Sequence, residues 1–287
     1  MIVIVDAVRT AMGGFQGSLS SLSAPQLGSV VIQETIKRAG IAATDVDEVI
    51  FGCVLPAGLK QAPARQAMRL AGVPDTVGAT TINKVCGSGM KAVMQAADAI
   101  KAGSANIIIA GGMESMSNAP YLLDKARGGL RMGHGKIIDH MFQDGLEDAE
   151  SGLSMGVLAQ EMADKKGYTR EQQDAYAIAS LQKAVDAVNN GYFKDEIAAV
   201  TVSSRKGDVV VDHDEQPFNA KIDKIPTLRP AFKKDGTITA ANSSSISDGA
   251  SALVITSDAI AREKGLTPLA QVVAYATNSQ QIGRASC

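Results

Sequence analysis

Short apolar runs alternate with amphipathic stretches over the first 117 residues of the chain. Apolar runs of strand length occupy residues 2–6, 46–53, 78–82 and 105–110. Helical patterns lie between them at 23–40, 63–70 and 88–101; Ser23 and Pro25 mark the start of the first helix and Gly40 marks its end. Strands that alternate with helices predict an α/β fold, in which a parallel or mixed sheet has helices on both faces.

This alternation breaks after Gly112. Residues 118–242 are less regular and richer in charge, which predicts an inserted and mostly helical subdomain. Helices are predicted there at 154–166 and 170–189; Thr169 and Gln172 form a capping box before the second, and Gly191 ends it. Regular structure returns with a predicted strand at 251–256, a short helix from Ser257 to Gly265, and a further strand at 271–277.

Composition narrows the class of protein. The chain has 287 residues, of which 45% are hydrophobic, so it can bury one large core or two domains. A formal net charge of −2 argues against a nucleic-acid partner or a basic membrane anchor, and no apolar run approaches a membrane span. No secretory signal is visible, and the widely spaced Cys53, Cys86 and Cys287 fit neither a disulfide framework nor a zinc pattern. These features predict a soluble protein of the reducing cytoplasm.

The stretch from Asn83 to Lys91 contains the strongest candidate for covalent chemistry. Its sequence, Asn-Lys-Val-Cys-Gly-Ser-Gly-Met-Lys, places Cys86 on a sharp turn between the predicted strand at 78–82 and the helix at 88–101. Because this helix has only a narrow polar stripe, we expect it to be buried around most of its circumference. Unpaired N–H groups at its start and the helix dipole would favour a thiolate beside them. A lone cysteine is also often an inert core residue, so local physics leaves both interpretations open.

The same stretch resembles the acyl-enzyme cysteine motif of the thiolases, specifically those of the acetyl-CoA acetyltransferase type. The resemblance continues in the family's order at residues 5–10, 13–17, 110–117, 228–232 and 242–250. It implies the thiolase fold and acyl transfer through an acyl-cysteine intermediate. The family's reaction is a Claisen condensation of two acetyl-CoA to acetoacetyl-CoA and CoA, or the reverse, the thiolysis of a 3-ketoacyl-CoA.

The resemblance also implies roles for individual residues. Cys86 matches the nucleophile, and its backbone N–H matches one donor of an oxyanion hole. Ser244 matches a serine in the segment that binds coenzyme A, although turn chemistry in a Ser-rich loop would also explain it. Met155 and Gly156 match a Met-Gly pair that contacts the thioester end of the substrate. No metal is implied, and no cofactor beyond the coenzyme A thioesters themselves.

Two departures from the family pattern concern substrate binding. Ser154 stands where this type often has a histidine before the Met-Gly pair, which leaves the acyl-chain preference open. The region 216–219 reads Gln-Pro-Phe-Asn where an arginine often meets the nucleotide, and this predicts weaker or differently arranged phosphate contacts.

Thiolases consist of two similar halves, and a loop domain is inserted in the first. On this pattern, residues 1–117 and 243–270 form the N-terminal core domain, and 118–242 form the loop subdomain for coenzyme A binding and tetramerisation. Residues 271–287 would be the start of a second domain and a tail that matches nothing in the family. The family's second-half motifs, with the activating His, the partner Asn and the second Cys, are absent from the printed sequence. We therefore expect the chain as printed to be inactive; the alternative is a non-catalytic coenzyme A-binding or assembly fragment.

Two further features concern partners and alternatives. The cationic, Gly-rich stretch 125–136 has the charge of a solvated surface loop, but a similar loop joins dimers in tetrameric thiolases. The resemblance thus implies a homotetramer (a dimer of dimers) and a place in fatty acid metabolism. His134, His140 and His213 lie outside any catalytic motif and are expected at the surface. Asp139 beside His140 leaves an independent cysteine hydrolase as a third possibility.

Overall fold

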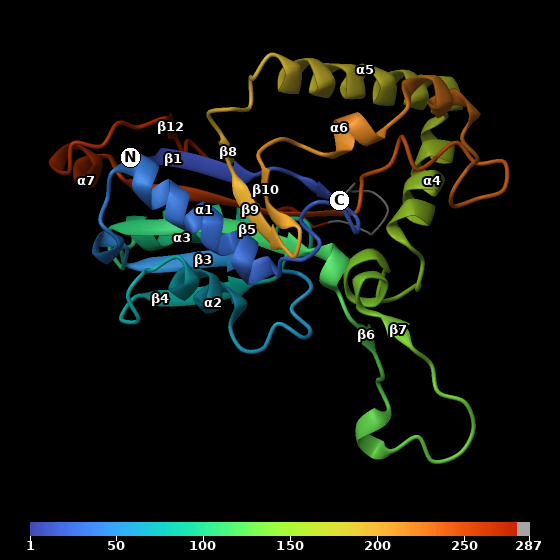
Figure 1. The fold of residues 1–287 in the computed structure, drawn as a ribbon, viewed down its shortest axis with the longest axis horizontal. Helices are drawn as coiled ribbons and strands as arrows, with labels where there is room; N and C mark the ends of the chain where they lie inside the picture. Colours follow the sequence, from blue (N-terminus) through green and yellow to red (C-terminus); the bar gives the residue numbers. More distant parts are fainter. Residues whose placement is uncertain (280–287) are drawn as a thin grey trace.

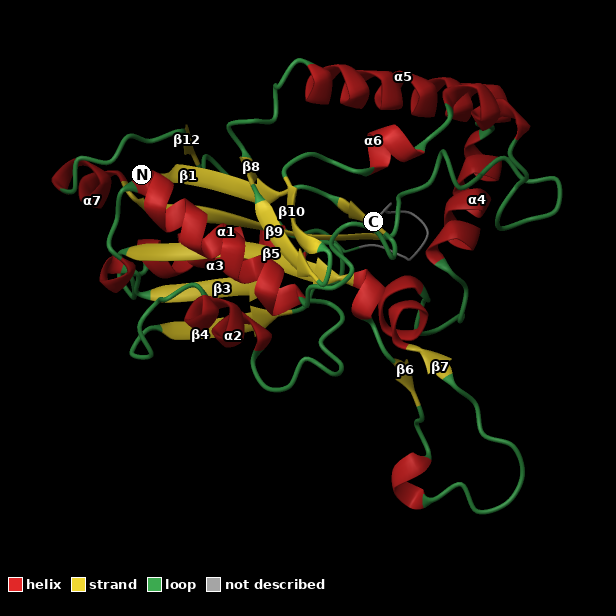
Figure 2. Ribbon diagram, viewed as in Figure 1, coloured by secondary structure: helices red, strands yellow, loops and turns green. Residues whose placement is uncertain are grey.

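A mixed β-sheet forms the centre of the molecule (Figures 1 and 2). The computed structural model describes residues 1–279; Cys287 and the rest of the predicted tail at 280–287 lie outside the described residues. The strand order is β12-β1-β11-β5-β3-β4, with the short strands β2 and β8 paired at its margin. The bounds are β1 (Ile2–Thr10), β2 (Gly13–Gly14), β3 (Glu48–Gly52), β4 (Gly78–Ile82), β5 (Ile107–Ser115), β8 (Ile197–Ala198), β11 (Ser247–Ser257) and β12 (Ala270–Gln271). Strands β3, β4 and β5 are parallel, whereas β11 runs antiparallel to β1 and β5.

Helices cover both faces of this sheet, as predicted. Helices α1 (Ala24–Ala39) and α2 (Pro63–Leu70) pack on one face, and α3 (Ser88–Lys101) packs on the other. Side chains of β5 alternate between the two layers: Ile107 and Ile109 join the core under α1 and α2, and Ile108 joins the core under α3. The helix α7 (Asp258–Glu263) follows β11. Because both faces are covered, the central strands are continuous apolar runs in the sequence. The α/β prediction is confirmed.

Most predicted helix bounds are confirmed, because helical periodicity is a local signal in the sequence. The helices at 63–70, 88–101 and 170–189 have the predicted bounds, and Thr169 and Gln172 form the expected capping box. The predicted strand at 271–277 is wrong beyond Gln271. It pairs antiparallel to β1 and runs toward the first residue of that strand, so residues after Val272 have no strand to pair with.

The expected burial of α3 is confirmed only for part of its circumference. Its buried residues are Ser88, Ala92, Ala96, Ala97 and Ile100, whereas Met90 is 68% exposed. Alanine-rich helices lack a strong polar face, so the sequence pattern alone does not show how many neighbours such a helix has.

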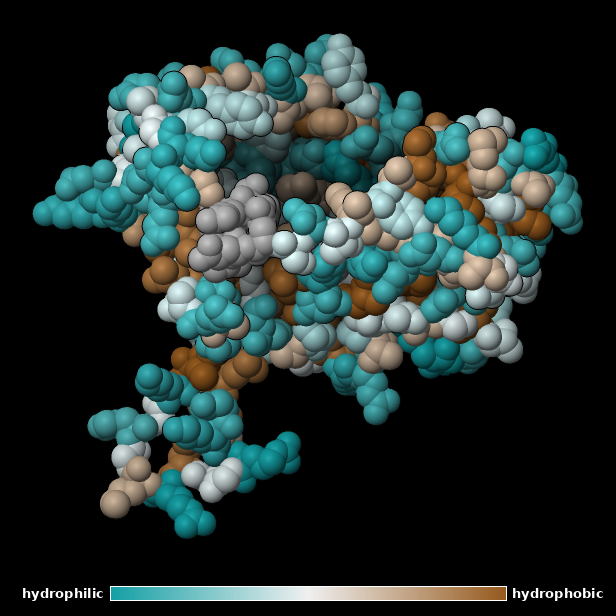
Figure 3. Space-filling view, turned by 180° about the vertical axis from the view of Figure 1, so that it is seen from behind, coloured by the Kyte–Doolittle hydropathy of each residue, from teal (hydrophilic) through white to brown (hydrophobic). Residues whose placement is uncertain are grey.

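Residues 118–242 leave the sheet and return to it. Helices α4 (Met155–Lys166), α5 (Arg170–Asn189) and α6 (Gln216–Asn219) form a lobe, with α5 along the top of Figure 1. The strands β6 (Tyr121–Leu122) and β7 (Ile138–Asp139) form a hairpin that projects from the body, with the cationic stretch 125–136 in its loop. Figure 3 shows this projecting hairpin, called the arm below, from behind. It also shows a hollow between the upper lobe and the core.

The inserted segment is also tied to the core sheet. Strand β8 pairs in parallel with the end of β1. The hairpin of β9 (Val200–Ser204) and β10 (Gly207–Val211) buries Val200 and Val211 against Leu27 of α1. The predicted domain boundaries at 117 and 243 stay a prediction. Within residues 1–279, no helix combines the length and the apolar character that a membrane span requires.

Candidate active site

A strained turn holds Cys86 immediately before α3. Val85 has a φ of 48°, a left-handed conformation that β-branched residues rarely adopt. The Ser88 hydroxyl accepts a hydrogen bond from the Lys84 N–H at 2.8 Å and donates one to the Val85 carbonyl at 2.6 Å. The Asn83 side-chain oxygen accepts a hydrogen bond from the Val85 N–H at 2.8 Å. These side chains keep the strained turn in place, and Cys86 is exposed on it.

Two N–H groups at the start of α3 are used by the turn itself. The Gly87 N–H donates to the Lys84 carbonyl, and the Ser88 N–H donates to the Val85 carbonyl. Ser88 is the first residue of α3, so the expectation of unpaired N–H groups beside the sulfur is wrong for this one group of the helix. A Cβ at Gly52 would lie 2.5 Å from the Ser88 Cβ, so glycine at this position lets the start of α3 approach the end of β3.

A cavity of about 580 Å³ lies beside Cys86. Gly52 from β3 and Gly112 from β5 line it, which places it at the carboxyl ends of parallel strands, where open α/β sheets bind ligands. Residues of β1 and β11 line it as well. Apolar side chains also contribute: Met12, Val54, Leu55, Val85, Met113, Met116, Leu146 and Ala250. The sulfur therefore reaches a largely apolar cavity of the size of a small-molecule site.

Glu114 lines the same cavity, with its carboxylate held by the backbone. Its oxygens accept hydrogen bonds from the Val54 N–H at 2.8 Å and the Leu55 N–H at 3.1 Å. Burial raises the pKa of Glu114 above its ordinary value, although these two donors oppose the shift. Burial, together with the nearby Glu114 charge, raises the pKa of the Cys53 thiol to about 12. Cys53 is therefore a neutral thiol at physiological pH and has little nucleophilic character.

Ser244 lines a second cavity, of about 910 Å³. Residues 240–245 form one wall, and α5 supplies Gln172, Gln173, Tyr176 and Ser180 from across it. The same segment of chain connects the two cavities: Ser244 lines the second cavity, and Ser247 lines the cavity beside Cys86. Three residue steps separate Ser244 from Ser247, a span of at most about 11 Å. One ligand could thus contact both cavities along this segment.

Met155 and Gly156 begin α4 and line neither of these two cavities. The Ser154 hydroxyl is the N-cap of this helix and accepts a hydrogen bond from the Val157 N–H at 3.4 Å. A Cβ at Gly156 would overlap the ring of Phe232, so packing accounts for the glycine. The role of the Met-Gly pair near the thioester stays a prediction.

His140 is buried, so the expectation of a surface position is wrong for this residue. It is 4% exposed, and its Nδ1 lies 2.5 Å from Asp144, one helical turn further along the chain. Its Nε2 accepts a hydrogen bond from the Ala57 N–H at 3.4 Å. The neighbouring Asp139 accepts instead from the Met141 N–H. Both ring nitrogens of the buried His140 therefore have hydrogen-bond partners.

His134 and His213 are exposed, as expected. In the described part of the chain, no histidine lines the cavity beside Cys86. The cysteine-hydrolase alternative therefore lacks a histidine base at the sulfur.

The family relationship follows from comparison with known proteins. The family model described as "Thiolase, N-terminal domain" matches residues 2–259. The chain belongs to the thiolase family. The resemblance found in the sequence is confirmed, and the family is one of enzymes.

Individual relatives share a more specific name. The protein named "Acetyl-CoA acetyltransferase" from Pseudomonas aeruginosa is 51% identical over 278 residues, which cover 96% of this chain and 71% of the relative. A protein of the same name from Escherichia coli (strain K12) is 52% identical over 277 residues, covering 96% and 70%. The "Probable acetyl-CoA acetyltransferase" of Dictyostelium discoideum is 48% identical over 280 residues, covering 97% and 68%.

Several residues around the two cavities were missed by the sequence analysis. No local sequence pattern indicates the contacts of Ser88 and Glu114. A local pattern does exist for Arg170 and Asp174, because opposite charges four residues apart on a helix predict an ion pair. That spacing does not reveal that Asp174 also contacts Asn242, which is distant in sequence.

Proposed function

We propose that this protein is an acetyl-CoA acetyltransferase in which Cys86 accepts the acyl group. The Cys86 thiolate attacks the carbonyl carbon of acetyl-CoA, the thioester C–S bond breaks, and coenzyme A leaves as a thiolate that takes up a proton. A second acetyl-CoA loses an α-proton to a base, and its carbanion attacks the acetyl carbon. The products are acetoacetyl-CoA and the regenerated Cys86 thiolate; thiolysis is the reverse sequence.

The position of Cys86 is the observation that supports this proposal most directly. The sulfur is exposed on a strained turn and lies on a largely apolar cavity at the carboxyl ends of β3 and β5. Such a cavity suits a short acyl group, and Ser244 on the neighbouring cavity suits the polar arm of coenzyme A. The proposed reaction needs no metal and no cofactor beyond its thioester substrates.

Acylation and condensation make different demands on the site. Condensation needs a base for carbon deprotonation and donors for two developing oxyanions. Among the described residues that line the cavity there is no histidine, and Cys86 is its one cysteine. We propose that this chain by itself undergoes acylation and binds coenzyme A without completing turnover. Incubation with acetoacetyl-CoA and coenzyme A tests this, and turnover above background would contradict it.

Acetylation of Cys86 tests the central step. Acetyl-CoA is incubated with the protein, and tryptic peptides are analysed by mass spectrometry; we expect one acetyl group on the peptide that contains Cys86. The Cys86→Ala variant should lose it, whereas the matched control Cys53→Ala should keep it, because Cys53 is a buried neutral thiol. An unmodified Cys86 in folded protein would overturn the proposal.

An assembly role is the second candidate function. The projecting hairpin exposes Met132 (98%) and Ile137 (71%), apolar side chains that suit a protein interface. We propose that this arm joins dimers into a homotetramer, and that the protein acts in the cytoplasm in fatty acid metabolism. Size-exclusion chromatography with and without a full-length relative separates the roles. A stable mixed complex without acetylation of Cys86 would favour the assembly fragment.

A further inference from the structure

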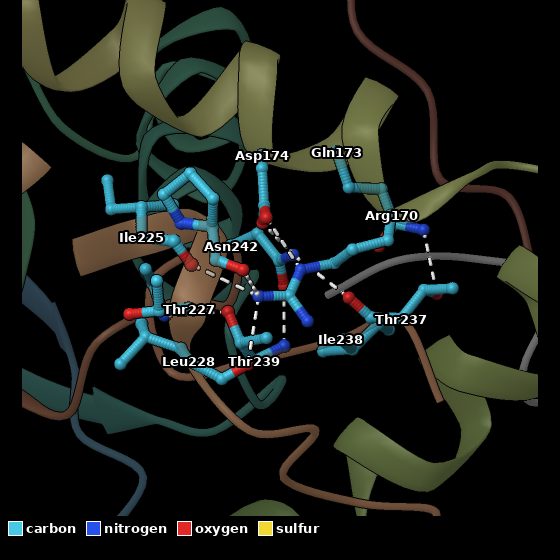
Figure 4. Close-up of polar contacts among 12 residues, drawn as sticks. Arg170, Gln173, Asp174, Ile225, Thr227, Leu228, Thr237, Ile238, Thr239 and Asn242 are labelled. Carbon is cyan, nitrogen blue, oxygen red and sulfur yellow. Dashed lines mark hydrogen bonds and ion pairs between the residues drawn. The ribbon is translucent and has the colours of Figure 1, made fainter. Parts of the chain in front are cut away.

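The segment that leads to Ser244 has no strand partner and is held by side chains. Residues 237–245 lie outside the strands and helices of the described structure, and β11 begins at Ser247. Figure 4 shows polar side chains of α5 meeting this segment. Asp174, at the centre of the contacts, is 5% exposed, and aspartate is rarely buried this deeply unless it is paired.

Arg170 is the first partner of this buried carboxylate. Its Nε lies 2.6 Å from Asp174 Oδ2, one helical turn further along α5. Its Nη2 donates to the carbonyls of Ile225 at 3.0 Å and Leu228 at 2.9 Å (Figure 4). The guanidinium therefore neutralises Asp174 and attaches the 3₁₀ helix Ile222–Thr227, with Leu228 after it, to α5.

Asn242 is the second partner of Asp174, and both its amide nitrogen and its amide oxygen form hydrogen bonds. Its Nδ2 donates to Asp174 Oδ1 at 3.0 Å and to the Thr237 carbonyl at 3.1 Å. Its Oδ1 accepts from the Thr239 N–H at 2.7 Å. These three bonds define the side-chain rotamer of Asn242 and close the backbone between 237 and 242 into a loop (Figure 4).

Two glutamines support the other end of this loop. Gln173 of α5 donates to the Thr237 hydroxyl at 2.8 Å and also lines the Ser244 cavity. Gln160 of α4, which is 1% exposed, accepts from the N–H groups of Thr237 at 2.8 Å and Ile238 at 2.9 Å. Helix α5 thus lines the cavity with Gln173 and, through Gln173 and Asp174, bonds to the segment that forms another of its walls.

We propose that Arg170 and Asp174 are positioning residues for coenzyme A: they hold the segment 242–245 so that Ser244 faces its cavity before the ligand arrives. This inference rests on the proposed function, in which the Ser244 cavity binds coenzyme A. An irregular segment without these bonds would have to be ordered during binding, and that cost would reduce the affinity.

Hydrogen exchange of the ligand-free protein tests the positioning itself. Arg170 and Asn242 each donate to a different oxygen of Asp174, and Asp174→Asn replaces one of these oxygens by an NH₂ group. The Thr239 N–H donates to Asn242 Oδ1, and the Ala241 N–H donates to the Thr239 hydroxyl at 3.2 Å, so we expect faster exchange of these two amides. Arg170→Lys is a second variant, with the same direction and a smaller effect. The control Lys183→Ala, an exposed position on α5, should leave both amides unchanged. Unchanged exchange in Asp174→Asn would overturn the proposal, whatever binds in the cavity.

The affinity for coenzyme A, measured by isothermal titration calorimetry, tests the consequence. We expect Asp174→Asn to raise the Kd about tenfold, the size of one lost hydrogen bond to a charged group. If Asp174 acts through Ser244, the effects of Asp174→Asn and Ser244→Ala will be less than additive in the double variant. Additive effects would overturn the proposal. If Ser244→Ala alone leaves the Kd unchanged, the assignment of the cavity fails, whereas the exchange result still decides the positioning.

Discussion

Gly111 shows how strongly one residue can depend on the neighbouring strand. It lies in β5 opposite Ala252 of β11, and a Cβ at this position would overlap the Ser251 carbonyl. The overlap is with backbone in the middle of the sheet, so a side-chain rotation cannot relieve it. Two strands that both border the Cys86 cavity would have to move apart.

We therefore expect Gly111→Ala to lower the free energy of unfolding by about 3 kcal/mol. Urea unfolding followed by circular dichroism measures the change. Gly78→Ala is the matched control, because the nearest atom to a Cβ there is 3.7 Å away and β4 is an edge strand. The control should stay within about 0.5 kcal/mol of the parent chain. Equal stabilities of the two variants would contradict the proposed overlap.

The element that decides the chemistry is α3 together with the turn before it. Ser88 is the first residue of the helix, and its hydroxyl bridges the Lys84 N–H and the Val85 carbonyl. These bonds hold Val85 in a left-handed conformation and so determine the direction in which Cys86 points.

Ser88→Ala should remove this bridge and leave two backbone groups without their partner. We expect the free energy of unfolding to fall by about 1–2 kcal/mol and the acetylation of Cys86 to slow about tenfold. Quenched-flow mass spectrometry measures the rate. Ser29→Ala on α1 serves as control, since its hydroxyl only donates to the Gln26 carbonyl within the same helix. A normal acetylation rate in Ser88→Ala would show that the turn does not depend on the hydroxyl.

At the scale of the whole molecule, Arg9 ties the inserted segment to the first strand. Its guanidinium donates to both oxygens of Asp214, at 2.7 and 2.9 Å, and to Glu196 at 2.6 Å. Burial by itself would raise the pKa of Asp214, but the hydrogen bonds from Arg9 and the Met12 N–H together outweigh it, and the pKa lies below its ordinary value of 3.8.

This shift predicts how stability depends on pH. Because the folded state favours the Asp214 carboxylate, its contribution is fully present well above pH 3.8 and is lost as the pH falls through the lowered pKa. Asp214→Asn should therefore be about 1–3 kcal/mol less stable at pH 7, and its difference from the parent chain should shrink under acidic conditions. Thermal unfolding between pH 7 and pH 3 measures this. The exposed neighbour Asp212→Asn should lower the stability at pH 7 by much less; an equally large loss in both variants would refute the assignment to Asp214.

Some of this structure could be predicted because its causes are local. The bounds of α2, α3 and α5 follow from helical periodicity, and Thr169 and Gln172 specify the start of α5 within four residues of sequence. The position of Cys86 between a strand and a helix could be predicted for the same reason. By contrast, the predicted strand after residue 271 depends on a partner from the other end of the chain, and the pattern extended it too far.

By itself, the amino-acid sequence determined the α/β class, most helices, the family and the position of the cysteine before α3. Periodicity, capping and sequence motifs depend on residues that are close together in the sequence, so they can be recognised without the structure. Only the tertiary structure decided which side chains meet at the two cavities. Asp174 and Asn242 are separated by 68 positions, and Arg9 and Asp214 by 205. Such contacts depend on how the sheet and the inserted lobe pack together, and no local pattern specifies that packing.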